Sequence, residues 1–284
     1  NFSNMYLILD YYVGGDWGGQ VWQHPNPATW PSPTSSAAQF QIDWVRVWQR
    51  IQDTTKEMIG RWSLDESEGT TAADGSGKEM HGTLMGGLSF ETDRVNGNLG
   101  TALMFDGVDD YIELPAGFDE FDNGCTVALW AKPTAVKNHA RFIDLGNGSY
   151  ANNIILARSG TSNGLLFKVF GKDTSAGGVV AADAIELNRW QFFAATINTS
   201  GNVTIYKNGQ SIQTGTSTWP WGLTRTQNYI GRSNWSSDAY YEGAMDEIRV
   251  YDYALSAAEI QALFLATAHC MEPYPEYLDL NWDC

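Results

Sequence analysis

The sequence predicts an all-β protein whose main part is a two-sheet sandwich of antiparallel strands. Short apolar stretches recur between residues 58 and 265, and turn residues separate them. Such a density of short strands is typical of sandwiches. The chain also holds 29 glycine residues, which suits many turns, whereas long amphipathic helical patterns are scarce. We therefore expect sheets to bury the core.

The apolar stretches place the individual elements in order along the chain. Strands are expected at residues 61–64, 102–105, 111–114, 126–132, 141–145, 154–158, 165–170, 190–198, 203–207, 228–231 and 245–251. Asn208 and Gly209 follow one of these strands and favour a two-residue hairpin, because both turn positions need a positive φ. Ser256, with Glu259 three residues later, forms a capping-box pattern and predicts one short helix.

Changes in composition divide the chain into four segments. Residues 1–50 contain two apolar runs, 5–13 and 40–49, around a connection rich in Gly, Pro and Ser. Two strands cannot bury a core, so we expect this segment to complete a larger unit, to pair with a partner chain or to pack onto the sandwich. The other segments are a linker at 51–57, the sandwich at 58–265 and an acidic tail at 266–284.

Charge narrows the classes of partner. Asp and Glu number 33 against 17 Lys and Arg, so the formal net charge is −16. An acidic surface repels nucleic acid and anionic lipid, which argues against both as partners, and it disfavours sulfated polymers. Calcium and neutral ligands suit such a surface. No run of 18 apolar residues occurs, so the sequence predicts no membrane-spanning helix.

Residues 58–265 resemble, in several blocks and in the right order, the laminin G-like domains of the concanavalin-type jelly-roll family. The early blocks are WSLDESEGTTAADGSGKEMHGTL, ALMFDGVDDYIELP and CTVALWAKP. The later blocks are NRWQFFAATIN, VTIYKNGQSI and GAMDEIRVYDYALSAAEIQAL. The resemblance implies a jelly roll of two antiparallel sheets. It also implies an extracellular, secreted protein that binds glycans, frequently with calcium.

Residues 1–50 resemble the C-terminal end of a glycoside hydrolase of family 16, the laminarinase-like β-glucanases. A late strand and loop of that family resemble MYLILDYYVGGDWGG, and its closing strand resembles FQIDWVRVWQ. Asp10 stands where the family commonly has Asn. The Glu-x-Asp-x-(x)-Glu pattern that carries the family's catalytic carboxylates is absent from the sequence. The chain therefore offers no predicted catalytic residue, and whether it is part of an enzyme stays open.

Calcium is the cofactor that the sequence favours. The ion takes roughly six to eight oxygen ligands, which Asp side chains and Gly-rich loops supply. In the jelly-roll family a structural ion often joins the first and last strands of the domain. The matching positions are Asp65 or Asp106 with Asp246, and Asp43 in residues 1–50. A capped turn or an ion pair with a nearby arginine is the alternative for these carboxylates.

A second calcium arrangement resembles that of the pentraxins, in which two loops meet on one face of the sandwich. Asn152 and Asn153 would supply one loop, and Asn234 and Asp238 would supply the other. Tight calcium sites carry more acidic ligands than this set, so a solvated loop is the alternative.

Aromatic residues in loops are the candidates for contact with a sugar. A flat ring covers the C–H face of a pyranose, and planar polar side chains pair with its hydroxyl groups. The candidates are Trp219, Trp221, Trp235, Tyr240 and Tyr241, with Asn234 and Asp238 beside them. Packing inside the protein is the alternative for these rings.

Three cysteines add little to this picture. Cys125 lies in an apolar strand pattern and is expected to be a buried thiol. Cys270 and Cys284 bracket the tail, where a disulfide would close a loop worth roughly 3 kcal/mol.

Two functions follow from these features. The first is a non-catalytic carbohydrate-binding domain, appended to a family-16-like hydrolase, that holds the enzyme on a polysaccharide, with β-glucan as the expected polymer. The alternative is an extracellular structural or adhesion subunit that is built from sugar-binding folds.

Overall fold

A computed structural model describes residues 56–171, 176–220 and 222–268. The chain divides into two units, Asn1–Ile51 and Gln52–Cys284. The predicted strands at 5–13 and 40–49 lie outside the described residues, as does the tail from residue 269 onward. Within the described residues, no helix has the length and apolar character that a membrane crossing requires.

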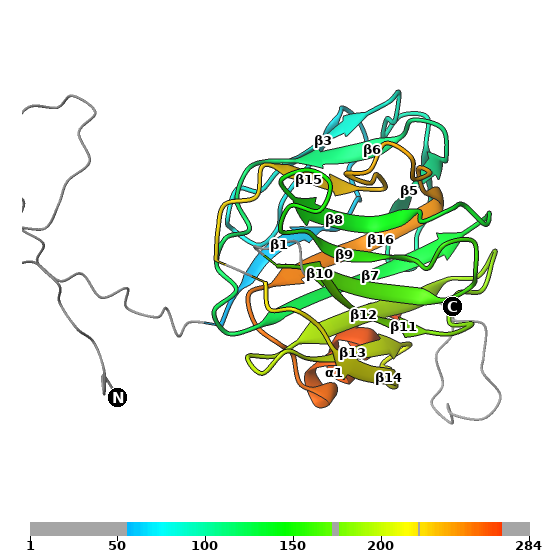
Figure 1. Ribbon diagram of the computed structural model, residues 1–284. Helices are drawn as coiled ribbons and strands as arrows, with labels where there is room; N and C mark the ends of the chain where they lie inside the picture. Colours follow the sequence, from blue (N-terminus) through cyan, green and yellow to red (C-terminus); the bar gives the residue numbers. More distant parts are fainter. Residues whose placement is uncertain (1–55, 172–175, 221, 269–284) are drawn as a thin grey trace, which may run out of the picture. The chain divides into compact units, whose positions relative to one another are not determined.

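The described residues form a sandwich of two sheets, with eight strands in each (Figure 1). Sheet A contains, in spatial order, β14 (Gln210–Thr216), β13 (Asn202–Lys207), β12 (Gln191–Ile197), β7 (Cys125–Pro133), β16 (Glu242–Tyr251), β5 (Thr101–Asp106) and β4 (Arg94–Asn96), while β1 (Met58–Trp62) also pairs with β16. Sheet B contains β11 (Ala176–Ala181), β10 (Leu165–Phe170), β9 (Ile154–Arg158), β8 (Arg141–Gly146), β15 (Gln227–Ile230), β6 (Tyr111–Leu114), β3 (Gly82–Met85) and β2 (Thr71–Ala72). Neighbouring strands pair antiparallel in both sheets, so the predicted all-β sandwich is confirmed.

The core lies between the two sheets and follows from the alternation of side chains along each strand. In β10, Leu165, Phe167 and Val169 belong to the main buried cluster. Phe170 belongs instead to a small separate cluster on the opposite face of the sheet. Successive side chains of a strand point to opposite faces, so sheet B carries a second, outward set of residues that are free to form a surface.

A helix covers part of the outer face of sheet A, where side chains of β7, β12 and β13 pack against it. Helix α1 (Ala257–Thr267) begins with the predicted capping box, in which Ser256 and Glu259 bond reciprocally. Phe264 of α1 stacks on Trp130 of β7, with 5.6 Å between the ring centroids. In Figure 1 the helix lies beside β13 and β14. The outer face of sheet B has no such helix among the described residues.

The sequence predicted one hairpin turn correctly but missed the strands that are short or lack an apolar pattern. Asn208 and Gly209 both have positive φ, 48° and 77°, as the predicted hairpin between β13 and β14 requires. Five strands are missing from the predicted ranges, namely β2, β3, β4, β11 and β14, of which the hairpin turn implied β14 alone. The first three are only two to four residues long, and β11 reads AGGVVA, so neither apolar alternation nor length marks them.

Candidate functional site

The candidate site lies on the outer face of sheet B, at strands β8, β9, β10 and β15. Asp144 from β8, Ile155 from β9 and Phe170 from β10 point to this face. The chain that joins β15 to β16, residues 231–241, passes over these strands and brings Trp235 onto them. The sheet is therefore a rigid base, and the loop above it carries the groups that can meet a ligand.

Trp235 is the centre of an aromatic cluster on this face. Its ring centroid lies 5.0 Å from that of Tyr150, at an interplanar angle of 82°, and 5.3 Å from that of Phe170. Tyr150 is 56% exposed, which is unusual for so large a ring, whereas Phe170 is buried. The cluster thus offers open aromatic surface while its base is fixed by packing.

Two hollows adjoin Trp235. Hollow 1 has a volume of about 190 Å³, and its lining includes Tyr229, Arg232 and Tyr240. Hollow 2 has a volume of about 370 Å³, and its lining includes His139, Tyr150, Lys168 and Phe170. Trp235 and Asp238 line both hollows. A ligand that lies across the tryptophan can therefore reach both hollows.

A buried carboxylate, Asp144, supports the loop from below. Its Oδ1 accepts hydrogen bonds from the side-chain amides of Asn153 at 2.8 Å and Asn234 at 2.9 Å. Its Oδ2 accepts the backbone N–H of Asn234 at 3.1 Å. Burial raises the pKa of Asp144, and the Arg141 charge and these hydrogen bonds oppose that rise. Asn234 is thereby held by both its backbone and its side chain.

Arg141 links the buried carboxylate to the surface of the site. Its guanidinium lies 3.4 Å from Asp144 and donates to Asp238 Oδ2 at 2.7 Å, while Ser233 donates to the same oxygen at 2.9 Å. The guanidinium carbon also lies 5.3 Å from the ring centroid of Trp235. These contacts fix the loop on both sides of Trp235 before any ligand arrives.

The structure brings together the two loops that the sequence pairs as a calcium site. Three of the four side chains are bonded within the protein, while Asn152 Oδ1 and Asn234 Oδ1 are buried without a hydrogen-bond partner among the described residues. Asn153 and Asn234 both bind the carboxylate of Asp144, and Asp238 pairs with Arg141. Asn152 contributes its backbone carbonyl to Arg225, at 2.9 Å. The Asn153 side chain is wholly buried, so its position shows a structural role.

The predicted aromatic residues separate into three groups. Trp235 and Tyr240 line the hollows. Tyr241 does not, because it is 2% exposed and belongs to the main core, where its hydroxyl donates to the carbonyl of Ala244 at 3.0 Å. Its assignment to the sugar-binding set is therefore corrected. Trp219 is half-buried after β14 and lines neither hollow, and Trp221 lies outside the described residues.

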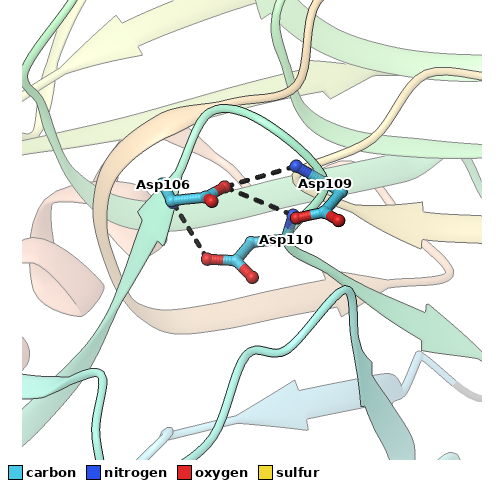
Figure 2. A group of neighbouring side chains, drawn as sticks. All are labelled: Asp106, Asp109 and Asp110. Carbon is cyan, nitrogen blue, oxygen red and sulfur yellow. Dashed lines mark hydrogen bonds between the residues drawn. The ribbon is translucent and has the colours of Figure 1, made fainter.

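Asp106 belongs to a turn with its own hydrogen bonds. Its carboxylate lies near those of Asp109 and Asp110, within 4.8 Å (Figure 2). Asp106 Oδ1 accepts the backbone N–H of Val108 at 2.8 Å and of Asp109 at 3.3 Å, and Asp110 Oδ2 accepts that of Asp106 at 3.0 Å. Burial raises the pKa of Asp106, but these hydrogen bonds outweigh it and leave the pKa below its usual value. Backbone hydrogen bonds of the turn thus hold its three carboxylates close together, and Asp106 as a calcium ligand stays a prediction.

Asp246 of β16 is in a different situation. Its Oδ2 accepts the backbone N–H groups of Asn98 at 2.9 Å and Leu99 at 3.0 Å. Its Oδ1 is buried and has no hydrogen-bond partner among the described residues, and the same holds for Asn98 Oδ1. Burial, followed by the neighbouring Glu247 charge and that of Asp65, raises the pKa of Asp246 to about 7.

Asp65 holds the other side of the same turn. Its Oδ1 accepts the backbone N–H of Thr101 at 2.8 Å. A side-chain carbon at Gly97 would lie 2.7 Å from Asp246 Oδ2, and one at Gly100 would lie 2.3 Å from Asp65 Oδ1, so the turn needs glycine to come this close. The sequence offered Asp65 or Asp106 as the partner of Asp246. The structure places Asp65 at the same turn as Asp246, whereas Asp106 belongs to a separate turn. Buried oxygens without a donor are suited to a hard cation.

Comparison with known proteins assigns the family. Residues 106–261 match the model of the Concanavalin A-like lectin/glucanases superfamily, in its laminin G-like branch. The chain belongs to this superfamily. No curated protein matches the chain.

Solved structures with the superfamily sandwich share the fold at low sequence identity. Domain 4 of AbnA, an extracellular GH43 arabinanase from Geobacillus stearothermophilus solved with arabinotriose, is 20% identical with a TM-score of 0.58, covering 73% of this chain and 98% of that one. The binding domain of Paraclostridial Mosquitocidal Protein 1 is 13% identical with a TM-score of 0.57, covering 74% and 52%. The binding domain of botulinum neurotoxin DC, in complex with rat synaptotagmin II, is 16% identical with a TM-score of 0.56, covering 74% and 52%. The chain thus spans about half the length of these toxin binding domains.

Several residues that line or support the site were not predicted from the sequence. They are Arg141, Asp144, Tyr150, Lys168, Phe170 and Arg232. A possible signal was the charge of Arg141 and Asp144 inside an otherwise apolar strand, because buried charges need a partner. Lys168 alternates with apolar residues, which shows that it faces away from the core but not what it faces.

Some of the predicted site and disulfide residues lie outside the described residues. They are Asp43, Cys270 and Cys284, together with the segment 1–50. Cys125 is a free, fully buried thiol, as expected, and burial raises its pKa to about 12.

Proposed function

We propose that residues 56–268 form a carbohydrate-binding module whose site is the outer face of sheet B around Trp235. The observation that supports this most is the fixed aromatic cluster with two adjoining hollows, each lined in part by polar side chains. Sugar sites combine an aromatic platform for the C–H face of a ring with a few polar groups placed for its hydroxyls.

Preorganisation of the site supports the same proposal. Arg141 and Asp144 hold the loop by hydrogen bonds to Asn234 and Asp238, so little freedom is lost when a ligand binds. The polar edges of the hollows then pair with hydroxyl groups that leave water. A mobile loop would have to be ordered first, at a cost in affinity.

The proteins of similar fold are consistent with a saccharide ligand. The arabinanase domain was solved with arabinotriose, and cell entry of botulinum neurotoxin type C depends on interaction with two ganglioside molecules. Their identities of 20% and 17% support the fold, and the chemistry of this chain's own face carries the proposal.

The wider setting is a further part of the proposal. The resemblance of residues 1–50 to family-16 hydrolases implies that the module is attached to such an enzyme, acts outside the cell and holds the enzyme on β-glucan. A tethered module raises the local concentration of polymer at a catalytic cleft without taking part in the reaction. Residues 1–50 lie outside the described residues, so this setting depends on the sequence alone.

Replacing the central tryptophan tests the proposed site. In calorimetric titration of the full chain with soluble laminarin and with arabino-oligosaccharides, Trp235→Ala should weaken binding of whichever sugar binds by about tenfold or more, because it removes the platform. Trp190→Ala is the matched control, since Trp190 is also partly buried but packs in the cluster beneath α1. Equal binding by the parent chain and Trp235→Ala would move the site elsewhere.

We also propose that calcium is bound beside Asp246. The two buried oxygens without a donor, Asp246 Oδ1 and Asn98 Oδ1, would be ligands, and Asp65 would hold the opposite side of the turn. The Asn98 amide donates to the carbonyl of Thr267, the last residue of α1, at 2.5 Å. The ion would therefore stabilise the join between β16, the turn and the helix.

A thermal measurement tests the calcium proposal. Calcium added to the full chain, after treatment with EDTA, should raise the unfolding temperature, because a ligand of the folded state alone stabilises it. Asp246→Asn should lose most of that rise, whereas Asp106→Asn should keep it. An equal rise in the Asp246→Asn variant would place the ion elsewhere, and no rise in the parent chain would reject it.

A further inference from the structure

The charges around Trp235 are opposite to those of the chain as a whole. The chain has 33 acidic and 17 basic residues, yet among the described residues the carboxylate that lines the two hollows is that of Asp238 alone. That carboxylate already pairs with Arg141 at 2.7 Å. Asp144, which lies below, also contacts Arg141 and accepts hydrogen bonds from two asparagines. The acidic groups that line or underlie the two hollows are thus paired within the protein. Glu113, the exposed cross-strand neighbour of Tyr229, lies on the same face but lines neither hollow.

Two cations on the same face are not satisfied in this way. Lys168, in hollow 2, has its ammonium 4.7 Å from the ring centroid of Phe170. Arg232, in hollow 1, has its guanidinium carbon 4.7 Å and 4.6 Å from the rings of Tyr111 and Tyr229. Neither has an ion pair with a carboxylate within the part of the chain that the structure describes. Both are held by aromatic rings and keep their charge available to a ligand.

Local charge decides recognition at such short range. Interactions between exposed charges are screened over about 8–10 Å at physiological salt, so the distant acidic residues count for little inside a hollow. A concave wall strengthens the field of the charges that line it. A cation in each hollow, on either side of a shared tryptophan, suits a polymer that carries negative charge on its sugar units.

We propose that the outer face of sheet B recognises an anionic saccharide, with a sugar ring on Trp235 and its negative groups at Lys168 and Arg232. This inference rests on the proposed carbohydrate binding. It departs from the neutral β-glucan that the resemblance of residues 1–50 implies. A carboxylate on a uronic acid and a sulfate ester supply the same chemistry, and titration with a ligand of each kind separates them.

Calorimetric titration of the full chain can decide the matter. The ligands are an oligogalacturonate, a sulfated galactan oligosaccharide and the neutral laminari-oligosaccharide, all of matched length and at the same ionic strength. The variants are Lys168→Gln with Arg232→Gln, and, as a control with the same change in charge, Arg94→Gln with Lys132→Gln. Arg94 and Lys132 belong to β4 and β7 of sheet A, away from the hollows.

One of the two anionic ligands should bind more tightly than the neutral one, and higher salt should weaken it. The Lys168→Gln, Arg232→Gln variant should lose about tenfold or more of that affinity, while the sheet A control stays within about twofold. The anionic ligand that binds shows whether the site recognises a carboxylate or a sulfate ester. The inference is overturned if the neutral ligand binds at least as tightly as both anionic ones, or if the sheet A control loses as much affinity.

The proposed function fails by a different result. If none of the saccharides binds, or if Trp235→Ala binds them as the parent chain does, the sugar-binding face itself is rejected together with its charge preference. If Trp235→Ala abolishes binding of a neutral sugar that the charge variants still bind, the module stands and the anionic preference falls.

Discussion

Arg141 and Asp144 form an ion pair that is almost wholly removed from water. Their side chains are 6% and 0% exposed. Removing one partner of such a pair leaves the other charge buried without compensation, which costs about 3–5 kcal/mol. Arg141→Gln should therefore lower the free energy of unfolding by about that amount, measured by denaturant titration.

A second variant shows whether charge is the cause. In Arg141→Gln with Asp144→Asn, the wholly buried charge is gone, although Asp238 still loses its partner, and Asn can still accept at one oxygen from the neighbouring amides. The double variant should be more stable than Arg141→Gln alone. Additive losses in this double-mutant cycle would mean that the two side chains do not interact energetically.

The raised pKa of Asp246 predicts a pH dependence. In the absence of calcium the folded state binds a proton at Asp246 up to about pH 7, whereas an ordinary Asp has a pKa of 3.8. The folded state then holds more protons than the unfolded state across this window. The contribution of Asp246 to stability is therefore present below the ordinary pKa and is lost as the pH rises toward about 7.

The Asp246→Asn variant isolates that contribution from those of other carboxyl groups. Burial also raises the pKa of Asp110, to about 6, so the parent chain alone would mix two groups. With EDTA present, the stability of the parent relative to Asp246→Asn should fall between about pH 4 and pH 7 by up to about 4 kcal/mol. Denaturant titrations of both proteins at several pH values measure this, and parallel curves would rule it out.

At the scale of residues, the sequence predicted positions better than partners. Trp235, Asn234 and Asp238 were candidates and do lie at one face. Tyr241, six residues after Trp235, is in the core, because only the fold decides where the loop turns back into β16. The group that holds this loop, Asp144, comes from a strand far away in sequence, and no local pattern connects the two.

Among the secondary-structure elements, α1 is the one whose stability is easiest to change alone. Ser256 accepts the N–H of Glu259, and the Glu259 side chain accepts the N–H of Ser256. Ser256→Ala should cost about 1 kcal/mol, because helix N–H groups lose their acceptor. Calorimetry should show an unfolding temperature lower by a few degrees. Sugar binding on sheet B should be unchanged, and a parallel loss of binding would show that the two faces are coupled.

The strands differ in how clearly the sequence marks them. The central strands β7, β12 and β9 are buried on both faces and appear as continuous apolar runs. The strands that the prediction missed lie at or near the ends of the sheets, where β4, β2 and β11 have a neighbour on one side only. With little surface to bury, such strands need no apolar pattern, so tertiary pairing alone creates them.

For the molecule as a whole, one core joins both sheets. The main buried cluster draws residues from β1 to β16, and no division within the described residues separates it. A fragment of residues 56–268 should therefore fold by itself and unfold in a single transition. Coincident denaturation curves from tryptophan fluorescence and circular dichroism would support this. Two separate transitions would show that the core is divided, and a fragment without structure would show that the rest of the chain is needed.

The net charge of the sequence was a poor predictor of the charge at the candidate site. The value of −16 favours neutral ligands and calcium when it is spread evenly. The fold instead places Lys168 and Arg232 on one face and keeps Asp238 in an ion pair. Total charge can be counted from a sequence, but its distribution over a surface depends on which strands become neighbours.

The covering of sheet A by α1 also limits how the domain can hold a polymer. With part of one sheet covered and the other carrying the hollows, each copy of the proposed module would engage a polysaccharide from one side. A single weak contact of this kind would break and reform often, so the domain would move from repeat to repeat along the polymer rather than stay at one place. Lasting attachment then requires avidity, from several copies on one particle or one chain, and the spacing between copies would have to match the polymer.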